Sequence, residues 1–268
     1  MRIARFSIDD EVKFGLVEGE GELPESLEVA EILGHPFGPV QVTQRRWPLS
    51  RVRLLAPVLP SKVIGIGRNY ADHAAELGNE APGKADPAVV FLKPSTSVIG
   101  PSDAIQYPLG VSFDVQHEAE LAVVIGRMCR QVPVARVPEV VLGYTCGNDV
   151  TARDLQRAEN QWGRAKGFDT FCPLGPWIET GASVGDLALT MSVNGEVQQR
   201  GSTAQLRRAV PELVAYASSV MTLLPGDVLL GGAAGAAGTG GVMLDCGDEV
   251  SVSIDGIGTL TSRVEKGD

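Results

Sequence analysis

The stretch Glu118-Ala-Glu-Leu-Ala-Val-Val-Ile125 joins two carboxylates to five apolar residues in a row. A short apolar run that ends at a glycine, here Gly126, indicates a buried strand. Side chains i and i+2 of a strand share a face, so Glu118 and Glu120 point the same way, about 7 Å apart at the backbone. Two such charges repel, and a cation between them would relieve the repulsion. The alternative, which the spacing alone favours, is an exposed strand start where water screens both acids.

Other short apolar runs are bounded by glycine or proline in the same way and predict further strands. They are Val63–Ile66, Val89–Leu92, Val141–Thr145 and Trp177–Glu179. Two hairpins are also predicted, because Asn-Gly and Asp-Gly supply the positive φ angles that tight turns need. These are Leu189–Val193 with Val197–Gln199 around Asn194-Gly195, and Val250–Ile254 with Thr259–Val264 around Asp255-Gly256.

Helices are few in this sequence. Apolar residues recur at helical spacing from Leu213 to Leu224, with Pro211 in the first turn and Pro225-Gly226 as the stop. A second, short helix is predicted over Tyr70–Leu77, just before Gly78. The fold class that follows is α+β and mostly β.

The first 60 residues predict a small β-rich N-terminal domain, followed by a second domain over residues 61–268. Arg2–Ile8 and Val12–Val17 flank an acidic turn and would pair as a hairpin. The boundary is marked by three prolines, Pro48, Pro57 and Pro60, beyond which apolar character rises.

Charge and composition narrow the class of partner. The 268 residues include 33 acidic and 23 basic side chains, which gives a net charge of −10, and the isoelectric point is about 4.9. Nucleic acid is therefore not expected as a partner, because no Lys/Arg cluster offers an electrostatic footprint. A small-molecule ligand, cationic or bridged by a metal, suits this balance better.

No targeting or membrane segment is expected. Asp9, Asp10 and Glu11 interrupt the apolar start that a secretory signal needs. The longest uncharged stretch, Val228–Leu244, contains six glycines and is interpreted as a loop rather than a membrane span. The four cysteines are widely spaced, with no metal-type pairing, and are expected to be free thiols in a reducing, cytoplasmic protein.

Asp149 adds a third carboxylate to the Glu118–Glu120 pair. It follows the predicted strand Val141–Thr145, at a strand end where site residues commonly lie. Three carboxylates without His or Cys form an all-oxygen site that selects Mg²⁺, Mn²⁺ or Ca²⁺ over zinc or copper. The alternative is that Asp149 caps a helix beginning in Val150–Asp154.

Two further features could carry proton chemistry. His73 and Glu76 lie three apart in a predicted helix, so the carboxylate could orient the imidazole as a general base that activates water. Lys166 is a lone lysine between apolar stretches and could offset the negative charge of an enolate. The alternatives are a solvated His–Glu pair on a surface helix and an ordinary surface lysine.

These motifs, in this order, closely resemble the fumarylacetoacetate hydrolase family from about Ser61 to the C-terminus. Five motifs in register carry the resemblance, and each is moderately specific. They are Gly65-x-Gly67-Arg68-Asn69-Tyr70-x-x-His73-x-x-Glu76, Phe91-Leu92-Lys93-Pro94, Glu118-x-Glu120-Leu121, Asn148-Asp149-x-x-x-Arg153-Asp154 and Lys166-Gly167-Phe168-Asp169-x-x-Cys172-Pro173-Leu174-Gly175-Pro176.

The resemblance implies a mixed β-sheet roll, a homodimer, and a small N-terminal domain in front of the catalytic one. It implies Mg²⁺ or Mn²⁺ held by three carboxylates, a His–Glu pair on a lid helix, a site lysine, and a set of substrate-binding residues. These fall on Glu118, Glu120 and Asp149 for the metal, His73, Glu76 and Lys166 for catalysis, and Arg68, Asn69, Tyr70, Gly231 and Ala233 for the substrate.

The reactions implied are those of 2-oxo and 2,4-dioxo acids through a metal-bound enolate. They comprise C–C bond hydrolysis, decarboxylation and enol isomerisation. A Lewis acid would polarise the dicarbonyl, Lys166 would steady the enolate, and His73 with Glu76 would move a proton or activate water.

One segment departs from the family pattern. Where the family usually has T-G-T-P-x-G-V-G, this chain reads Gly231-Gly-Ala-Ala-Gly-Ala-Ala-Gly238, without the threonines and the proline. A buried carboxylate loses roughly 1–3 kcal/mol for each missing hydrogen-bond partner. The altered loop favours two alternatives: a specialised biosynthetic cyclase or dehydratase on the same scaffold, or a catalytically weakened binding member.

Overall fold

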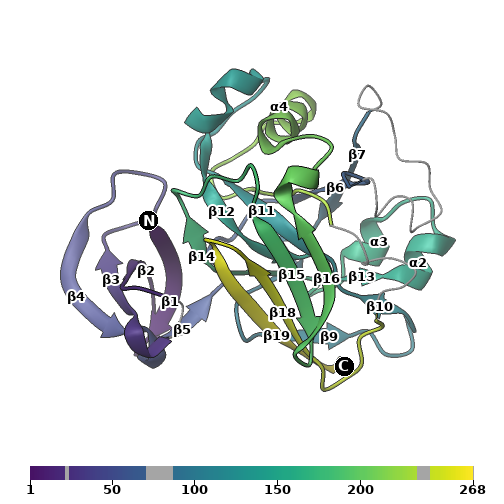
Figure 1. Ribbon diagram of the computed structural model, residues 1–268, viewed down its shortest axis with the longest axis horizontal. Helices are drawn as coiled ribbons and strands as arrows, with labels where there is room; N and C mark the ends of the chain where they lie inside the picture. The colour runs from purple at the N-terminus through teal and green to yellow at the C-terminus, as the bar shows by residue number, and fades with distance from the viewer. Residues whose placement is uncertain (22–23, 71–86, 234–241, 268) are drawn as a thin grey trace.

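Two large β-sheets form the framework of the computed structural model, which describes residues 1–21, 24–70, 87–233 and 242–267 (Figure 1). The predicted mostly β, α+β class is confirmed. The predicted helix Tyr70–Leu77 beyond its first residue, and with it His73 and Glu76, lies outside the described residues.

Five N-terminal strands form one end of the larger sheet, to the left in Figure 1. They are β1 (Arg2–Ile8), β2 (Glu11–Glu18), β3 (Glu28–Ile32), β4 (Val42–Pro48) and β5 (Arg53–Leu55). The predicted β1–β2 hairpin is confirmed, with an antiparallel register from Arg2↔Val17 to Ile8↔Glu11. Strand β1 also pairs with β14 through Ile3↔Ile178. Hydrogen bonding therefore continues from the N-terminal strands into the rest of the sheet.

The rest of this sheet runs in the order β14-β12-β11-β17-β6-β7, with β8 beside β14. Its strands are β6 (Val63–Gly67), β7 (Val89–Lys93), β8 (Val98–Ile99), β11 (Ala119–Ile125), β12 (Val141–Asn148), β14 (Cys172–Glu179) and β17 (Val228–Leu230). All seven residues of β11 are buried, in the middle of the strand order. The prediction of a loop from Val228 onward is wrong for Val228–Leu230, because these residues form β17 and pair with both β11 and β6.

The second sheet has the order β16-β15-β18-β19-β9. Its strands are β9 (Ala104–Tyr107), β15 (Ala188–Val193), β16 (Glu196–Ser202), β18 (Glu249–Ile254) and β19 (Gly258–Lys266). Both predicted hairpins form. Asn194 and Gly195 take the expected positive φ of 52° and 82°. In the second turn Gly256 has a positive φ and Asp255 does not. Three residues separate these strands, and a three-residue hairpin loop needs only one residue in the left-handed region.

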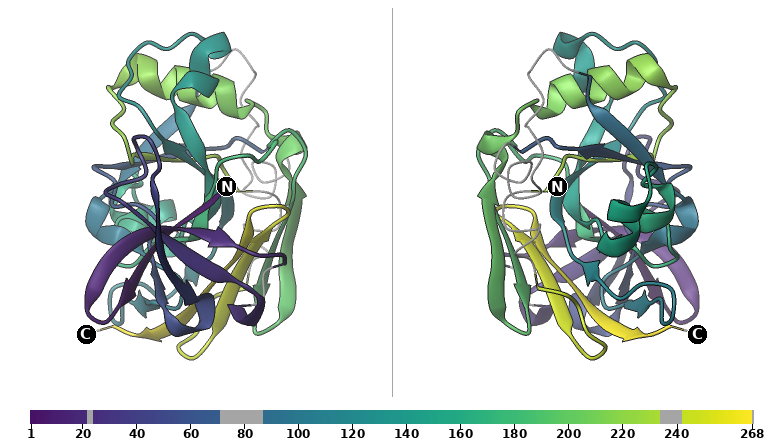
Figure 2. Two further views of the ribbon diagram at one scale, coloured as in Figure 1. Left: turned by 90° about the vertical axis from the view of Figure 1, so that its left-hand side faces the viewer. Right: turned by 90° about the vertical axis from the view of Figure 1, so that its right-hand side faces the viewer.

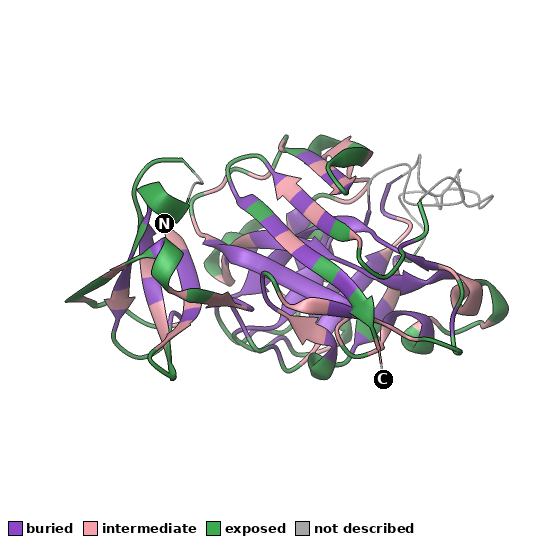
Figure 3. Cartoon of the chain, turned by 90° about the horizontal axis from the view of Figure 1, so that it is seen from below, coloured by how far each residue is buried: buried purple, intermediate pink, exposed green. Residues whose placement is uncertain are grey.

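The main core lies between the two sheets and extends to the longest helix. It combines inward-facing residues of β6 and β11 with those of β15, β18 and β19, and with the apolar side of α4. Figure 2 shows α4 across one end of the sheets, and Figure 3 shows buried residues concentrated along the central strands. Separate clusters lie on the opposite face of β11 and within the N-terminal strands.

Short helices and a small ribbon connect these strands. They are η1 (Pro24–Ser26), η2 (Leu49–Arg51), η3 (Ser95–Ser97), η4 (Val134–Glu139), α2 (Arg153–Ala158), α3 (Gly163–Lys166), η5 (Thr203–Gln205) and α4 (Val210–Val220), with the paired strands β10 (Val115–Gln116) and β13 (Thr151–Ala152). Helix α4 ends four residues before the predicted Leu224. The apolar spacing continues, but the backbone of Leu223 pairs with Cys129 and draws the chain out of the helix.

Two expectations about the whole chain can be compared with these elements. The four cysteines are free, as predicted. Within the described residues no helix combines the length and the apolar character needed to cross a bilayer.

Candidate metal centre and active site

The register of two neighbouring strands brings the predicted carboxylates together. Strands β11 and β12 are antiparallel with Ala119 opposite Asn148, so the next pair along is Glu118 and Asp149. The Asp149 N–H donates to the Glu118 carbonyl at 2.9 Å. Residues directly opposite in an antiparallel pair point to the same face, and Glu120 shares that face at i+2. One sheet face therefore carries all three acids.

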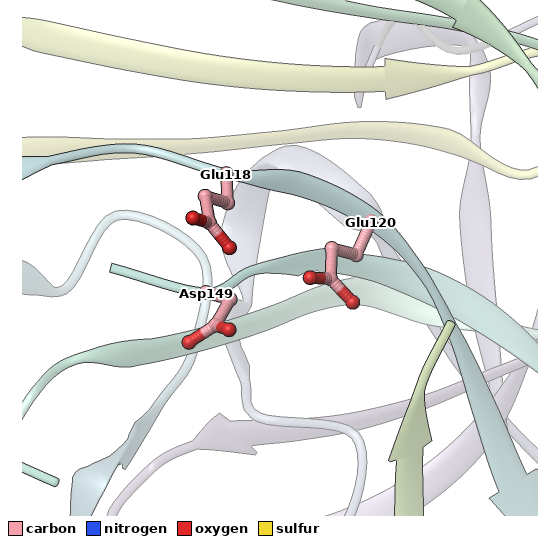
Figure 4. A group of neighbouring side chains, drawn as sticks. All are labelled: Glu118, Glu120 and Asp149. Carbon is pink, nitrogen blue, oxygen red and sulfur yellow. The ribbon is translucent and has the colours of Figure 1, made fainter. Parts of the chain in front are cut away.

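The three carboxylates converge on one small space (Figure 4). One ligand oxygen from each lies within 4.8 Å of the others. Glu118, Glu120 and Asp149 are 4%, 2% and 0% exposed. The alternative of an exposed, water-screened strand start is therefore wrong. The helix-cap alternative for Asp149 is also wrong, because α2 begins at Arg153 with Ala152 as its N-cap.

Lys166 lies among these acids and is not the surface lysine of the alternative interpretation. Its Nζ is 3.0 Å from Glu118 Oε2 and 2.5 Å from Asp149 Oδ2, and it donates to Thr151 Oγ1 at 2.8 Å. Burial lowers the pKa of this amine, but the charges of Asp149 and Glu118 offset that effect and the net pKa is raised. Lys166 is therefore a fixed ammonium and not a proton acceptor.

Arg153 is a second buried cation at the site, the first residue of α2. Its Nη2 lies 2.6 Å from Glu118 Oε1. Its Nε donates to Gln116 Oε1 at 3.1 Å, and its Nη1 donates to Gln156 Oε1 at 2.5 Å. With 1% of its surface exposed, the guanidinium holds the side of Glu118 that Lys166 leaves open.

Lys93 is the third buried cation, at the end of β7. Its Nζ lies 2.8 Å from Asp149 Oδ1. It also donates to three backbone carbonyls, those of Val150, Lys166 and Phe171, at 3.2, 2.5 and 2.8 Å. One ammonium thus holds a carboxylate together with the backbone that carries Lys166.

Glu120 differs from the other two acids. Among the described residues no lysine or arginine nitrogen lies within 4.0 Å of its carboxylate, and Oε2 accepts the Gly232 N–H at 2.7 Å. Burial raises its pKa well above the usual value, and the neighbouring charges of Asp149 and Glu118 raise it further. Without an added cation, Glu120 therefore holds its proton more tightly than an ordinary glutamate.

The residues present fit an oxygen-preferring divalent cation. Asp149 Oδ1 is buried and has no hydrogen-bond partner, because Lys93 meets it as an ion pair outside hydrogen-bond geometry. The Glu120 carboxylate, which has no lysine or arginine partner among the described residues, and this oxygen are both electron-pair donors that a cation would satisfy. An all-carboxylate donor set suits Mg²⁺, Mn²⁺ or Ca²⁺.

Two of the five residues predicted to bind substrate line the same cavity. Arg68, with φ of 58°, and Ala233 line it together with the acids. Asn69 is 3% exposed, and its carboxamide bonds the backbones of Arg208 and Gly231. Its carboxamide therefore links two backbone segments beside the cavity.

Tyr70 is also buried. Burial raises the pKa of its phenol, and the nearby charge of Glu120 raises it further. This phenol stays protonated at physiological pH.

Lys93 and Arg153 belong to the family motifs, but the sequence analysis predicts no role for either. For Lys93 a signal exists, because Phe91 and Lys93 occupy the same face of an otherwise apolar strand, where a charge needs a buried partner. For Arg153 the single sequence offers none.

Comparisons with known proteins assign the chain to a family. Residues 62–265 match the family described as Fumarylacetoacetate (FAA) hydrolase C-terminal. The chain belongs to the fumarylacetoacetate hydrolase family. Residues 1–57 match a second family, described as Rv2993c-like, N-terminal. The family predicted from the five sequence motifs is thereby confirmed.

Individual relatives cover the whole chain. Protein Rv2993c of Mycobacterium tuberculosis is 49% identical, over 98% of each chain. A structure named 5-carboxymethyl-2-hydroxymuconate delta-isomerase, from Mycobacterium smegmatis, is 50% identical with a TM-score of 0.89, over 99% of this chain and all of that one. Maleylpyruvate hydrolase from Sphingobium sp. SYK-6, solved with manganese(II) and pyruvate, is 31% identical with a TM-score of 0.78 over both complete chains.

Proposed function

We propose that this family member is a divalent-metal-dependent enzyme that forms the enolate of a 2-oxo acid or β-dicarbonyl compound. The observation that carries the proposal is the buried carboxylate triad with the ammonium of Lys166 fixed beside it. The manganese(II) and pyruvate in the name of the Sphingobium relative support it. C–C bond hydrolysis and decarboxylation release such an enolate when the C–C bond breaks, and enol isomerisation passes through one, so all three reactions share it.

Glu118, Glu120 and Asp149 would hold Mg²⁺ or Mn²⁺, and the bound cation supplies a Lewis acid for the substrate oxygens. Lys166 offsets the negative charge that develops on the substrate. In the metal-free protein, Asp149 and Glu118 raise the pKa of Lys166, so the site already holds this cation before the metal binds. Arg153 holds Glu118 in its orientation, and Lys93 does the same for Asp149.

His73 and Glu76 remain the predicted proton-transfer pair. They are the only site residues of the proposal that lie outside the described structure. In hydrolysis the pair would activate water, and in isomerisation it would move a proton between carbons. Mg²⁺ or Mn²⁺ as the native ion and a homodimeric assembly stay predictions from the resemblance.

Enolate formation can be tested without knowing the natural substrate. Proton NMR in D₂O, with 2-oxobutyrate and Mg²⁺ or Mn²⁺, follows exchange of the C3 protons, which reports stabilisation of the enolate that all three reactions share. Turnover of acetylpyruvate and oxaloacetate is measured in parallel. We expect metal-dependent exchange that Glu120→Ala abolishes, and that His73→Ala slows by roughly 10²–10⁴-fold, the usual contribution of a general base.

A matched control is Glu139→Ala, because Glu139 pairs with Arg136 on the surface. Its exchange rate should equal that of the unaltered protein. Metal binding without exchange or turnover would reject the proposal and favour the catalytically weakened binding member. Exchange without turnover of either dicarbonyl would favour a specialised cyclase or dehydratase.

A further inference from the structure

The sequence Gly65-Ile66-Gly67 on β6 has a physical explanation outside the metal chemistry. A Cβ at either glycine would lie on the same face of the strand, because the two positions are two residues apart. A Cβ added to Gly65 would lie 2.0 Å from the ring of Phe91, and one added to Gly67 would lie 2.4 Å from the ring of Trp162. Both distances are too short for any side chain. The two glycines therefore let two aromatic rings lie directly on the strand backbone.

These rings form one wall of the cavity that contains the carboxylates. Phe91 and Trp162 meet edge to face, with centroids 5.6 Å apart and planes inclined at 61°. The Nζ of Lys166 lies 4.9 Å from the centroid of Phe91. Phe91 is 9% exposed, whereas Trp162 is half-buried. Trp162 is therefore the ring with surface left for a ligand.

The cavity volume shows where a ligand must extend. The space above the acids measures about 20 Å³, room for little more than one water molecule. A groove of about 510 Å³ adjoins it and shares Arg68, Phe91 and Trp162 with it. A ligand whose oxygens reach the carboxylates therefore extends beyond this space, and the adjoining groove, which Val89, Val90 and Leu92 line in part, offers it room past Trp162.

We propose that Trp162 is the specificity-determining residue of this site. It stacks on a flat apolar group, aromatic or conjugated, that the substrate carries on the side away from its metal-binding oxygens. The proposal rests on the proposed function for one point only, that the 2-oxo acid end of the ligand meets the carboxylates. The aromatic surface and the glycines beneath it are observed independently.

The test uses binding, so that it does not depend on turnover. Calorimetry on the Mn²⁺-loaded protein compares pyruvate, phenylpyruvate and 2-oxoglutarate, which share one end and differ in their tails. We expect phenylpyruvate to bind more tightly than the other two. Trp162→Ala should lower the ratio of phenylpyruvate to pyruvate affinity by about tenfold, whereas Trp162→Phe should keep most of it.

Two matched controls separate stacking from a general loss of structure. Trp47 stacks on Phe6 in the N-terminal strands, and Trp47→Phe should leave the ratio unchanged. Gly67→Ala should lower the ratio, because the new Cβ displaces Trp162. Gly185→Ala should leave it unchanged, because a Cβ there meets no atom within 4 Å. Mn²⁺ affinity should be the same in all five variants, those of Trp162 included.

An unchanged ratio in Trp162→Ala would overturn the proposal, as would the absence of phenylpyruvate binding. Tighter binding of 2-oxoglutarate that is lost in Arg68→Ala would also overturn it and assign the groove to a carboxylate. An aromatic preference in a protein that exchanges no C3 protons would uphold Trp162 while rejecting the proposed function. The two conclusions can therefore fail separately.

Discussion

Two sides of the cavity are built differently. Ion pairs fix the acidic side chains near β11 and β12, whereas close packing on β6 fixes the aromatic rings of Phe91 and Trp162. On the charged side, Glu118 and Asp149 each contact two buried cations. On the aromatic side, Phe91 and Trp162 lie on glycine backbone and on each other. A buried charge that loses its partner costs about 3–5 kcal/mol, whereas a change of packed shape costs about 1–3 kcal/mol.

This difference indicates that the two sides of the cavity have different roles. The charged side tolerates almost no substitution, because each member satisfies several others, so it suits chemistry that is common to the family. The aromatic side can exchange one ring for another at small cost, so it suits the choice of substrate. Substitutions on the charged side should therefore affect metal binding and stability together, and those on the aromatic side should affect ligand preference, at a smaller cost in stability and with metal affinity unchanged.

Asp149→Asn should have the largest effect. It removes a proposed metal ligand and leaves Lys93 and Lys166 without the anion they share. We expect Mn²⁺ affinity to fall by more than the roughly 100-fold seen for loss of an outer-shell partner, and stability to fall by about 3–5 kcal/mol. Calorimetry and urea unfolding measure the two quantities. The control is Asp169→Asn at an exposed position, which should change neither.

Undiminished Mn²⁺ binding by Asp149→Asn would show that the cation is held elsewhere. A loss of metal binding with unchanged stability would contradict the coupling of charges described above.

Lys93→Met should have the next largest effect, on stability more than on binding. The substitution keeps the volume of the side chain but removes the ion pair to Asp149 and three backbone hydrogen bonds. We expect a loss of about 3 kcal/mol in urea unfolding and a roughly 10–100-fold weaker Mn²⁺ affinity. Lys266→Met, at an exposed position, should stay within about 0.5 kcal/mol. A Lys93→Met protein as stable as the unaltered chain would mean that Lys166 alone holds Asp149.

The sequence was sufficient for the acids because their positions follow from local rules. Glu118 and Glu120 share a face by strand alternation, and Asp149 ends a strand that the apolar pattern identifies. The three carboxylates lie close together because the register of β11 against β12 places Glu118 opposite Asp149. No local sequence pattern predicts that register. The resemblance to a family supplied that step before the structure did.

The cations were harder to predict, because a lysine or arginine is ordinarily solvated. Lys93 and Arg153 become site residues only when the carboxylates they contact, 56 and 35 positions away, are placed in space. The end of α4 shows the same limit. Its apolar spacing continues to Leu224, but pairing of Leu223 with the distant Cys129 ends the helix early.

Glu120→Gln should have the smallest effect on stability, and the opposite sign. In metal-free protein, burial raises the pKa of Glu120 above its unfolded value, so the folded state keeps a proton that the unfolded state loses. Stability is then fully present below the unfolded pKa, near 4.3, and declines as the pH rises toward the folded pKa. The amide cannot ionise, so the variant should gain stability relative to the unaltered chain from pH 4 to pH 8. Urea unfolding in EDTA measures this gain, and a difference independent of pH would mean that Glu120 is ionised without metal. The same variant should lose Mn²⁺ binding. Together the two results would show that the Glu120 carboxylate lowers the stability of the metal-free protein and is needed to bind the metal.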